Sequence, residues 1–305
     1  MTSSSHEMRA MGSSKRRADT GISHSIMVGT CRLRFDAPKV MGIVNVTPDS
    51  FSGDGIVHDA SRAILRGKAM FDAGADLVDV GGESTRPGAE PVPVEVETLR
   101  TTGVVEALSV HRPGRISIDT FKPEVAERAL FAGATTVNDV TGLRDPRMIS
   151  VVAEHDASVI IMHMKGEPRT MQVRPRYKDV VAEVASFLMD RVDAAEAAGV
   201  SPGRIMVDPG IGFGKTLDHN LEIIARLREF KAIGKPIVIG VSRKAFIGKL
   251  TDLPPEERVE GSLAAAVLAV RNGADVVRVH DVPETVRALK VAAPILSRQR
   301  TRGVH

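Results

Sequence analysis

The feature that most constrains this chain is a pattern that repeats eight times from residue 40 onward. In each repeat, a short β-branched run ends in Gly, Asp or Asn, and a longer stretch with helical spacing follows. The short runs are apolar on both faces, which is typical of strands buried between two layers, and the longer stretches predict helices. The predicted strands are Val40–Asn45, Leu77–Gly81, Ile116–Asp119, Thr136–Asp139, Ser158–Met162, Ile205–Asp208, Ile237–Gly240 and Val276–Val279. The predicted helices lie near Ala60–Ala73, Val94–Val110, Pro123–Ala132, Arg147–His155, Val180–Ala198, Leu217–Ile233, Glu256–Asn272 and Pro283–Ala293.

Several of these helices end with a glycine just before the next strand, at Gly74, Gly133 and Gly273. Glycine there supplies the left-handed conformation that ends a helix. Eight strand–helix units over about 255 residues match the size of a (β/α)₈ barrel. The sequence therefore predicts an α/β protein with a single-domain TIM barrel over residues 26–305. A doubly wound open sheet stays as the alternative, because a local pattern does not distinguish closed sheets from open ones.

The first 25 residues are rich in Ser, Met and Arg and lack the apolar stretch of a secretory signal. We interpret residues 1–25 as a disordered leader, and its Lys15-Arg16-Arg17 run as part of a solvated tail. The net charge is +3 and aromatic residues make up 3%, too few for stacking on single-stranded nucleic acid. No apolar run approaches the length of about 18 residues that a transmembrane helix needs. The lone Cys31 cannot form an intrachain disulfide, so nothing indicates an oxidising compartment.

Polar residues gather at the carboxyl ends of the predicted strands, where TIM barrels carry their chemistry. Asp119, Asn138 and Asp208 recur at matching places on three strands. A single aspartate at such a place is as well explained by capping of the next helix. Three together predict a row of acceptors and one amide that suits a flat, nitrogen-rich heterocycle with several N–H donors.

Positive charge is expected opposite these acceptors, from Lys244, Arg278 and His280 at the ends of the last two strands. Barrels often bind phosphate at this place, helped by the start of the following helix. For Lys244 or Arg278 taken alone, a structural salt bridge is an alternative role. The sequence therefore predicts one pocket with carboxylates at one end and an anion site at the other.

Longer motifs resemble those of a known family. The run Met41–Ser52 resembles the first signature of the dihydropteroate synthases, and the run Gly81–Gly88 resembles the second. After Ser52 this chain has Gly53-Asp54-Gly55 where the family commonly has Asp-Gly-Gly, which affects only the geometry of that loop. Shorter motifs follow in the family's order, at Ser117–Thr120, Asn138–Asp139, Met162–Met164, Asp208–Lys215, Ser242–Lys244 and Arg278–Asp281.

The resemblance implies a transferase of folate biosynthesis. It would condense 6-hydroxymethyl-7,8-dihydropterin pyrophosphate with p-aminobenzoate to give 7,8-dihydropteroate and pyrophosphate, with Mg²⁺ as cofactor. It also implies a cytoplasmic homodimer and a sulfonamide target. The second motif has no insertion after Pro87, which argues against the rearranged loop of sulfonamide-resistant relatives. Partners beyond these small molecules, such as nucleic acid or a membrane, are not expected.

The resemblance also implies a role for individual residues. Arg278 serves two groups, since its guanidinium would cover a pterin face and also contact the diphosphate. The implied pterin-binding residues are Asp119, Asn138, Met162, Asp208, Phe213, Lys244 and Arg278. The implied pyrophosphate-binding residues are Asn45, Thr85, Arg278 and His280, with Asn45 also the ligand of Mg²⁺. The implied p-aminobenzoate-binding residues are Phe51, Thr85, Arg86, Pro87 and Ser242. The residues expected to take part in catalysis are Asp49, Arg86, Asp208 and Lys244.

Two alternatives from other classes share part of this pattern. A pterin-binding methyltransferase barrel would keep Asp119, Asn138 and Asp208 but has no use for a pyrophosphate site or a p-aminobenzoate slot. A catalytically silent pterin-binding barrel would be indicated by loss of Arg86, Lys244 or His280, and all three are present. The sequence therefore favours the synthase.

Overall fold

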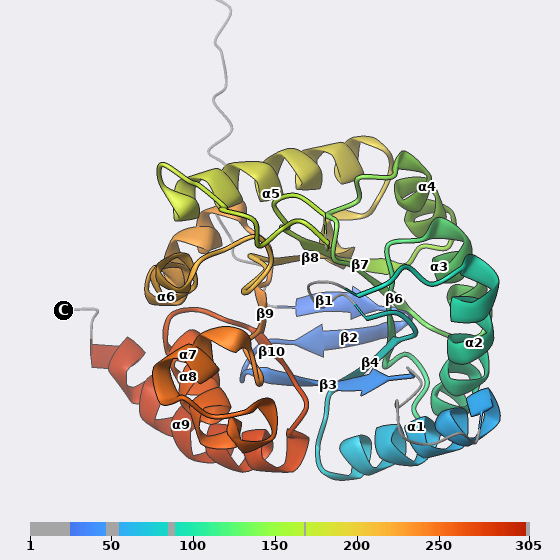
Figure 1. The fold of residues 1–305 in the computed structure, drawn as a ribbon, viewed down its shortest axis with the longest axis horizontal. Helices are drawn as coiled ribbons and strands as arrows, with labels where there is room; N and C mark the ends of the chain where they lie inside the picture. The colour runs from blue at the N-terminus through green and yellow to red at the C-terminus, as the bar shows by residue number, and fades with distance from the viewer. Residues whose placement is uncertain (1–24, 47–54, 85–88, 168, 303–305) are drawn as a thin grey trace, which may run out of the picture.

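The computed structural model describes residues 25–46, 55–84, 89–167 and 169–302. Eight parallel strands among them pair in the order β8-β7-β6-β5-β4-β3-β10-β9 (Figure 1). A bridge joins Val207 of β8 to Ile237 beside β9, and Val207 N donates to Pro236 O over 3.0 Å. The sheet is therefore closed into a barrel, and the open-sheet alternative is wrong. The strands are β3 (Lys39–Asn45), β4 (Leu77–Gly81), β5 (Ile116–Asp119), β6 (Thr136–Asp139), β7 (Ser158–Met162), β8 (Ile205–Asp208), β9 (Val238–Gly240) and β10 (Val276–Val279).

Helices form a ring around the strands (Figure 1). In the described part of the chain, no helix is long and apolar enough to cross a membrane. The α-helices are α1 (Gly55–Asp72), α2 (Val94–His111), α3 (Pro123–Phe131), α4 (Pro146–Glu154), α5 (Val180–Ala197), α6 (Leu217–Ala225), α7 (Ala245–Thr251), α8 (Val259–Arg271) and α9 (Val282–Arg302). Short 3₁₀ turns are η1 (Pro202–Arg204), η2 (Leu227–Ile233) and η3 (Pro255–Glu257).

The predicted strands agree with the observed ones to within one residue, whereas several predicted helices differ. The prediction of one helix over 217–233 was wrong, because α6 ends at the Arg226 C-cap and a separate 3₁₀ turn, η2, follows it. The prediction for 256–272 starts too early, since η3 precedes α8. Helix α7 was missed, and α9 continues past Pro294 to Arg302. The three predicted glycine ends are confirmed, with φ of 103°, 105° and 117° at Gly74, Gly133 and Gly273.

A two-stranded hairpin that the sequence analysis missed closes the amino-terminal end of the barrel. Strand β1 (Ser25–Val28) pairs antiparallel with β2 (Cys31–Arg34). Its Ile26, Val28 and Leu33 are buried in one cluster with inward side chains of the barrel strands. The hydroxyl of Ser158 donates to the Met27 carbonyl, which fixes the hairpin to β7. Residues 1–24 of the predicted leader lie outside the described residues, and Ser25 already begins β1.

The barrel interior changes from apolar to polar along its axis. Alternate residues of a strand face the same side, so the inward face of β4 carries Leu77, Asp79 and Gly81. The amino-terminal inward positions belong to the hairpin cluster and include Met41, Leu77, Ile160, Met206, Val238 and Val276. Two residues later on three of these strands come Asp79, Asp208 and Arg278. The apolar half therefore stabilises the barrel, and polar chemistry is confined to its carboxyl-terminal end.

Candidate active site

The inward side chains meet in a narrow cleft at the carboxyl-terminal end of the barrel. Six of the seven predicted pterin-binding residues line it together, and the seventh, Asp119, is hydrogen-bonded to one of the six. The cavity between them is about 20 Å³, room for about one water molecule. A flat heterocycle is larger than this cavity, so its entry would require some of the lining side chains to move. The lining residues are Asn138, Val140, Met162, Asp208, Gly210, Ile211, Phe213, Gly240, Lys244 and Arg278.

Arg278 lies between two carboxylates inside the barrel. Its Nε donates to Asp79 Oδ2 over 2.6 Å, and its Nη2 donates to Asp119 Oδ2. Burial disfavours its charge, but Asp79 and Asp119 outweigh this effect and raise the pKa of the guanidinium above its ordinary value. The expected separation of acidic and cationic ends is therefore incomplete. A buried guanidinium needs neighbouring negative charges, and here they are Asp79 and Asp119, of which Asp119 was expected to bind the heterocycle.

Asp119 is poised between its charged and neutral forms. Burial raises the pKa of its carboxyl to about 7, with Arg278 opposing the shift and the charge of Asp79 adding to it. Its Oδ1 is buried and has no hydrogen-bond partner among the described residues. An orphaned carboxylate oxygen in a closed interior is costly unless a ligand or water satisfies it. Asp119 therefore keeps one acceptor position open for a donor.

Asp208 is fixed by the loop that follows β8. Its Oδ1 accepts from Gly210 N over 2.7 Å. Gly210 has φ of 71°, and a Cβ added there would lie 1.9 Å from His163 O, so only glycine fits this turn. Burial raises the pKa of Asp208, whereas the Gly210 hydrogen bond, Lys244 and Arg278 lower it.

Lys244 and Phe213 form one wall of the cleft. The Lys244 amine lies 4.3 Å from the centroid of the Phe213 ring, within the range of a cation–π contact. Phe213 also packs with Met162 and Met171 in a small buried cluster at this end of the barrel. This wall combines an apolar surface with one cation, which suits the face and edge of a flat polar ring.

Ser242 and His280, expected in different subsites, are in contact with each other. The Ser242 hydroxyl accepts from His280 N over 3.2 Å and lies 3.1 Å from His280 Nδ1. Burial, and then the charge of Arg278, lower the pKa of His280 to about 3. The expected positive charge is therefore not supported for His280, because a buried imidazole beside a guanidinium stays neutral. It can still donate one hydrogen bond to an anion.

Asn45, at the end of β3, lies near Gly81 and Asp119. A Cβ added at Gly81 would lie 3.8 Å from Asn45 Oδ1 and 3.5 Å from Asp119 Cβ. Asn45 is exposed, unlike Asp119. Within the described residues, no cluster of three or more His, Cys, Asp or Glu side chains could hold a metal. A cation at Asn45 would therefore take most of its ligands from water and substrate oxygens.

Two buried charged residues beside the cleft, Asp79 and Lys215, were not predicted as site residues. Asp79 is fully buried in the middle of β4 and contacts both Arg278 and Asn138. Lys215 is buried beneath the cleft, with its amine 2.9 Å from His163 Nδ1 and 3.1 Å from Phe213 O. Burial lowers the pKa of Lys215 to about 7, and the nearby Asp208 opposes this. Inward alternation on β4 was the available signal for Asp79, and the glycine-rich run ending at Lys215 was the signal for the lysine.

Five predicted residues lie outside the described residues: Asp49, Phe51, Thr85, Arg86 and Pro87. The chain on both sides of residues 85–88 is firmly held. Glu83 Oε1 accepts from Val92 N over 3.3 Å, and the Lys122 amine donates to Glu83 Oε2 and to Val92 O. The same amine contacts the buried Glu97 of α2.

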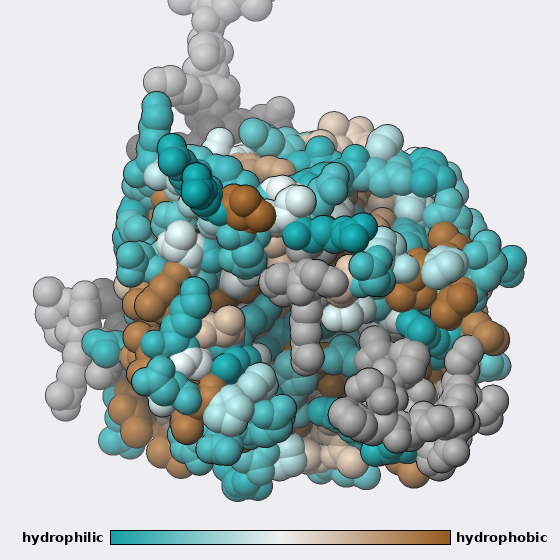
Figure 2. Space-filling view, in the orientation of Figure 1, coloured by the Kyte–Doolittle hydropathy of each residue, from teal (hydrophilic) through white to brown (hydrophobic). Residues whose placement is uncertain are grey.

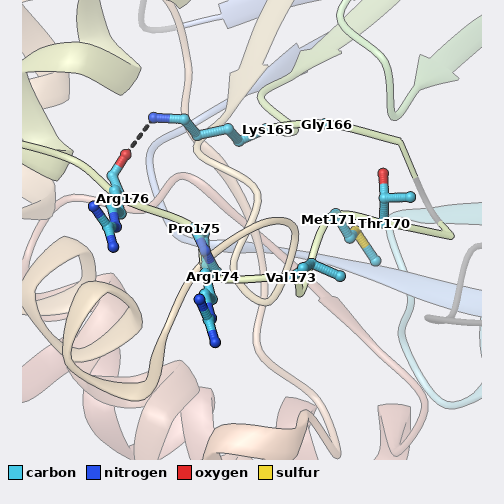
Figure 3. A pocket seen from close by; sticks show the side chains of 8 residues that line it. All are labelled: Lys165, Gly166, Thr170, Met171, Val173, Arg174, Pro175 and Arg176. Carbon is cyan, nitrogen blue, oxygen red and sulfur yellow. Dashed lines mark hydrogen bonds between the residues drawn. The ribbon is translucent and has the colours of Figure 1, made fainter.

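A second, larger cleft of about 350 Å³ lies in the loop between β7 and α5 (Figure 3). Figure 3 shows the Lys165 amine turned toward the Arg176 carbonyl, to which it donates. Met171 belongs both to this cleft and to the cluster around Phe213, so the cleft adjoins the first one. None of the described site residues predicted from the sequence lines it. Its lining residues are Lys165, Gly166, Thr170, Met171, Val173, Arg174, Pro175 and Arg176.

The chain is similar to proteins of known activity over most of its length. Residues 41–280 match the family model described as pterin binding enzyme. The dihydropteroate synthase of Escherichia coli is 46% identical over 85% of this chain and 92% of its own length. A Xanthomonas albilineans dihydropteroate synthase structure with 4-aminobenzoic acid is 46% identical, covers 89% of this chain and 98% of that one, and has a TM-score of 0.83. The Yersinia pestis enzyme in complex with a sulfonamide drug is 40% identical, covers 90% and 99%, and has a TM-score of 0.85.

Proposed function

Since this chain belongs to the dihydropteroate synthases within the pterin-binding enzyme family, we propose that the cleft at the carboxyl-terminal end of its barrel is where a dihydropterin and p-aminobenzoate are joined. The chain is a transferase that forms a carbon–nitrogen bond with loss of pyrophosphate. The observation that carries the assignment to this cleft is the convergence of Asn138, Asp208, Lys244 and Arg278 on one small cavity.

The pterin edge is read by carboxylate and amide acceptors. This role is supported for Asp119 by its orphaned Oδ1, and for Asn138 and Asp208 by their place in the cleft lining. Lys244 reaches the ring carbonyl and a ring nitrogen from the Phe213 side, and Met162 supplies an apolar contact. Because the cleft is small, we propose that the Arg278 guanidinium moves from Asp119 onto the pterin face when the ring binds.

The diphosphate leaves from the side of Asn45, Arg278 and His280. Neutral His280 donates a hydrogen bond, and Arg278 supplies charge. The donor set fits Mg²⁺, a hard cation that usually keeps several waters and binds proteins through one or two oxygens beside substrate phosphates; Asn45 Oδ1 would be that protein oxygen. When bound, Mg²⁺ would neutralise the leaving diphosphate.

The chemical step is a substitution at the pterin methylene carbon. The bond from this carbon to the diphosphate oxygen breaks, and the p-aminobenzoate nitrogen forms the new bond and loses one proton. The dihydropterin delocalises the positive charge that develops, and Asp208 stabilises it electrostatically from its fixed position beside Gly210. A preorganised carboxylate needs no reorientation when the charge appears.

The p-aminobenzoate slot combines Ser242 with Phe51, Thr85, Arg86 and Pro87, and Asp49 orders the loops that exclude water. For the four slot residues outside the described part of the chain, and for Asp49, these roles stay predictions. The carboxylate of p-aminobenzoate is the group for which Arg86 is suited, and the same site would take a sulfonamide.

A homodimer and a cytoplasmic location are further proposals. The dimer is supported by exposed apolar side chains on neighbouring helices, with Leu268 on α8 and Val291 and Ile295 on α9. Figure 2 shows apolar groups along the lower left edge, where α8 and α9 lie. Light scattering of Leu268→Glu against the unsubstituted protein tests the dimer, and fractionation of the source cells tests the location.

Pyrophosphate release is the decisive assay of function. Release is expected only with dihydropterin pyrophosphate, p-aminobenzoate and Mg²⁺ together. Release without p-aminobenzoate would indicate a hydrolase. No release, with pterin still bound, would indicate the silent barrel, and methyl transfer from a methylated folate would indicate the methyltransferase.

A further inference from the structure

Asp79 reaches two of the residues that line the cleft from deeper inside the barrel. It is fully buried, it does not line the cleft itself, and it lies two residues before Gly81 on the inward face of β4. One of its oxygens, Oδ2, accepts from Arg278 Nε over 2.6 Å and from Asn138 Nδ2 over 2.9 Å. A single buried carboxylate oxygen therefore fixes both a guanidinium and an amide.

The contact with Asn138 determines which end of that amide faces the cleft. The Oδ2 atom of Asp79, paired with Arg278, can only accept hydrogen bonds, so the group beside it must be the amide nitrogen. Asn138 lines the cleft and is itself buried. With its nitrogen committed to Asp79, Asn138 offers its carbonyl oxygen to a ligand. The cleft then presents acceptors from Asn138, Asp119 and Asp208.

We propose that Asp79 is a positioning residue that makes the cleft selective for a ring edge rich in N–H donors, by holding the Asn138 amide with its oxygen toward the ligand. The inference rests on the proposed pterin site and adds the residue that sets its preference for a 2-amino ring. In a ring with an oxo group in place of the 2-amino group, the ligand oxygen would face the carbonyl oxygen of Asn138. Both acceptors would lose their water without gaining a hydrogen bond, which weakens binding.

The test compares two ligands that differ at position 2 and at the adjacent N1. Pterin has a 2-amino donor beside an N1 acceptor, whereas lumazine, its 2-oxo analogue, has a 2-oxo acceptor beside an N1–H donor. Calorimetric titration of both into the full-length protein gives an affinity ratio. We expect Asp79→Leu, which removes the acceptor, to lower the pterin-to-lumazine ratio by about tenfold, the value of roughly one hydrogen bond. Asp79→Asn retains a carbonyl that can accept from both partners, so it should restore most of the ratio.

The ratio separates positioning from general damage. A loosened barrel would weaken both ligands alike, whereas loss of amide orientation weakens only pterin relative to lumazine. The matched control is Asp275→Leu, which removes a carboxylate that accepts from Ile237 N and contacts Lys231 at the opposite end of the barrel. Its ratio should equal that of the unsubstituted protein.

Two outcomes would overturn the inference. The first is an unchanged ratio in Asp79→Leu with pterin binding still measurable, and the second is an equal loss in the Leu and Asn variants, which would assign the effect to charge. If Asp79→Leu does not fold, Asp79→Val carries the same expectation, because this smaller apolar side chain also lacks an acceptor for the Asn138 amide. Failure of the unsubstituted protein to bind pterin would instead refute the proposed function.

Discussion

The substitution Asp119→Asn should stabilise the fold while it removes most of the affinity for pterin. Asp119 is buried against Arg278, and burial raises the pKa of its carboxyl from 3.8 to about 7. A neutral amide of the same shape avoids the cost of holding a charge in that environment. It loses the charged acceptor that the ring edge is expected to bind.

The magnitude follows from proton linkage. Because the folded-state pKa lies above the ordinary value, the folded protein keeps a proton that the unfolded chain releases between about pH 4 and pH 7. The stability that this proton contributes is complete below pH 4 and is lost as the pH rises through 7. A shift of about 3 units corresponds to about 4 kcal/mol. The hydrogen bond from Arg278 to the neutral amide is weaker than the one to the carboxylate, which reduces this stabilisation by about 1–3 kcal/mol. The free energy of unfolding of Asp119→Asn is therefore expected to exceed that of the unsubstituted protein by about 1–3 kcal/mol at pH 8.

Urea unfolding of both proteins at pH 4, 6 and 8 measures this difference. The two free energies of unfolding should nearly coincide at pH 4 and separate in favour of Asp119→Asn as the pH rises. Pterin affinity at pH 8 should fall by about 10–100-fold in the variant, the value of a hydrogen bond to a charged group. If the difference in the free energy of unfolding between the two proteins did not change with pH, or if the variant were less stable at pH 8, burial would not be what destabilises the charged form of Asp119.

Three further substitutions test other parts of the molecule. Arg278→Lys should lower kcat/KM for the pterin substrate by about 100-fold in steady-state assays, because a lysine lacks the planar fork that reaches two carboxylates; near-normal turnover would contradict the role of that fork. Gly210→Ala should lower the free energy of unfolding in urea by about 3 kcal/mol or more, because the added Cβ would clash with His163 O. The control Gly203→Ala, with open space around it, should lower it by less than about 1 kcal/mol. Equal losses in the two variants would contradict this explanation. Leu33→Ala should lose about 2–5 kcal/mol with unchanged KM values, and a stability loss below about 1 kcal/mol would show that the hairpin is not part of the core.

The barrel strands were predictable because each is a short apolar run bounded by residues that favour turns. The hairpin Ser25–Arg34 was not, because its two strands have four residues each and its partners are inward side chains of six barrel strands, most of them far along the chain. Helix α7 has only seven residues and starts directly after Lys244. A segment of two turns gives too little periodicity to separate it from a loop.

The same distinction applies to the site. Asp119, Asn138 and Asp208 could be found because they lie within one residue of the ends of their strands, at the rim of the barrel. Asp79 lies in the middle of Leu77–Gly81, with apolar neighbours on both sides. A single carboxylate within such an apolar run is read as an irregularity of the strand pattern and not as a site residue. Its role becomes clear only when Arg278, nearly 200 residues later, is seen to donate to it. The residues proposed to bind the pterin could thus be predicted from the ends of strands, whereas the residue proposed to orient Asn138 required the tertiary contacts.

This division explains why the site needs a closed barrel. In an open sheet of the same strand order, β4 and β10 would flank β3 in the same way, but β6 and β8, which carry Asn138 and Asp208, would not face them across an enclosed axis. The observed sheet has β3 between these two strands, so both inward side chains reach the same enclosed axis. In this enclosed interior the charges of Asp79 and Arg278 interact strongly, and few other groups are near enough to pair with either of them. A ring that offers N–H donors to Asp119 can replace the Nη2 donor of Arg278 there, while Asp79 keeps its contact with Nε. The freed end of the guanidinium then has the ring face and the diphosphate as its nearest partners. Substrate binding would thereby move the cation to the place where the leaving group needs it.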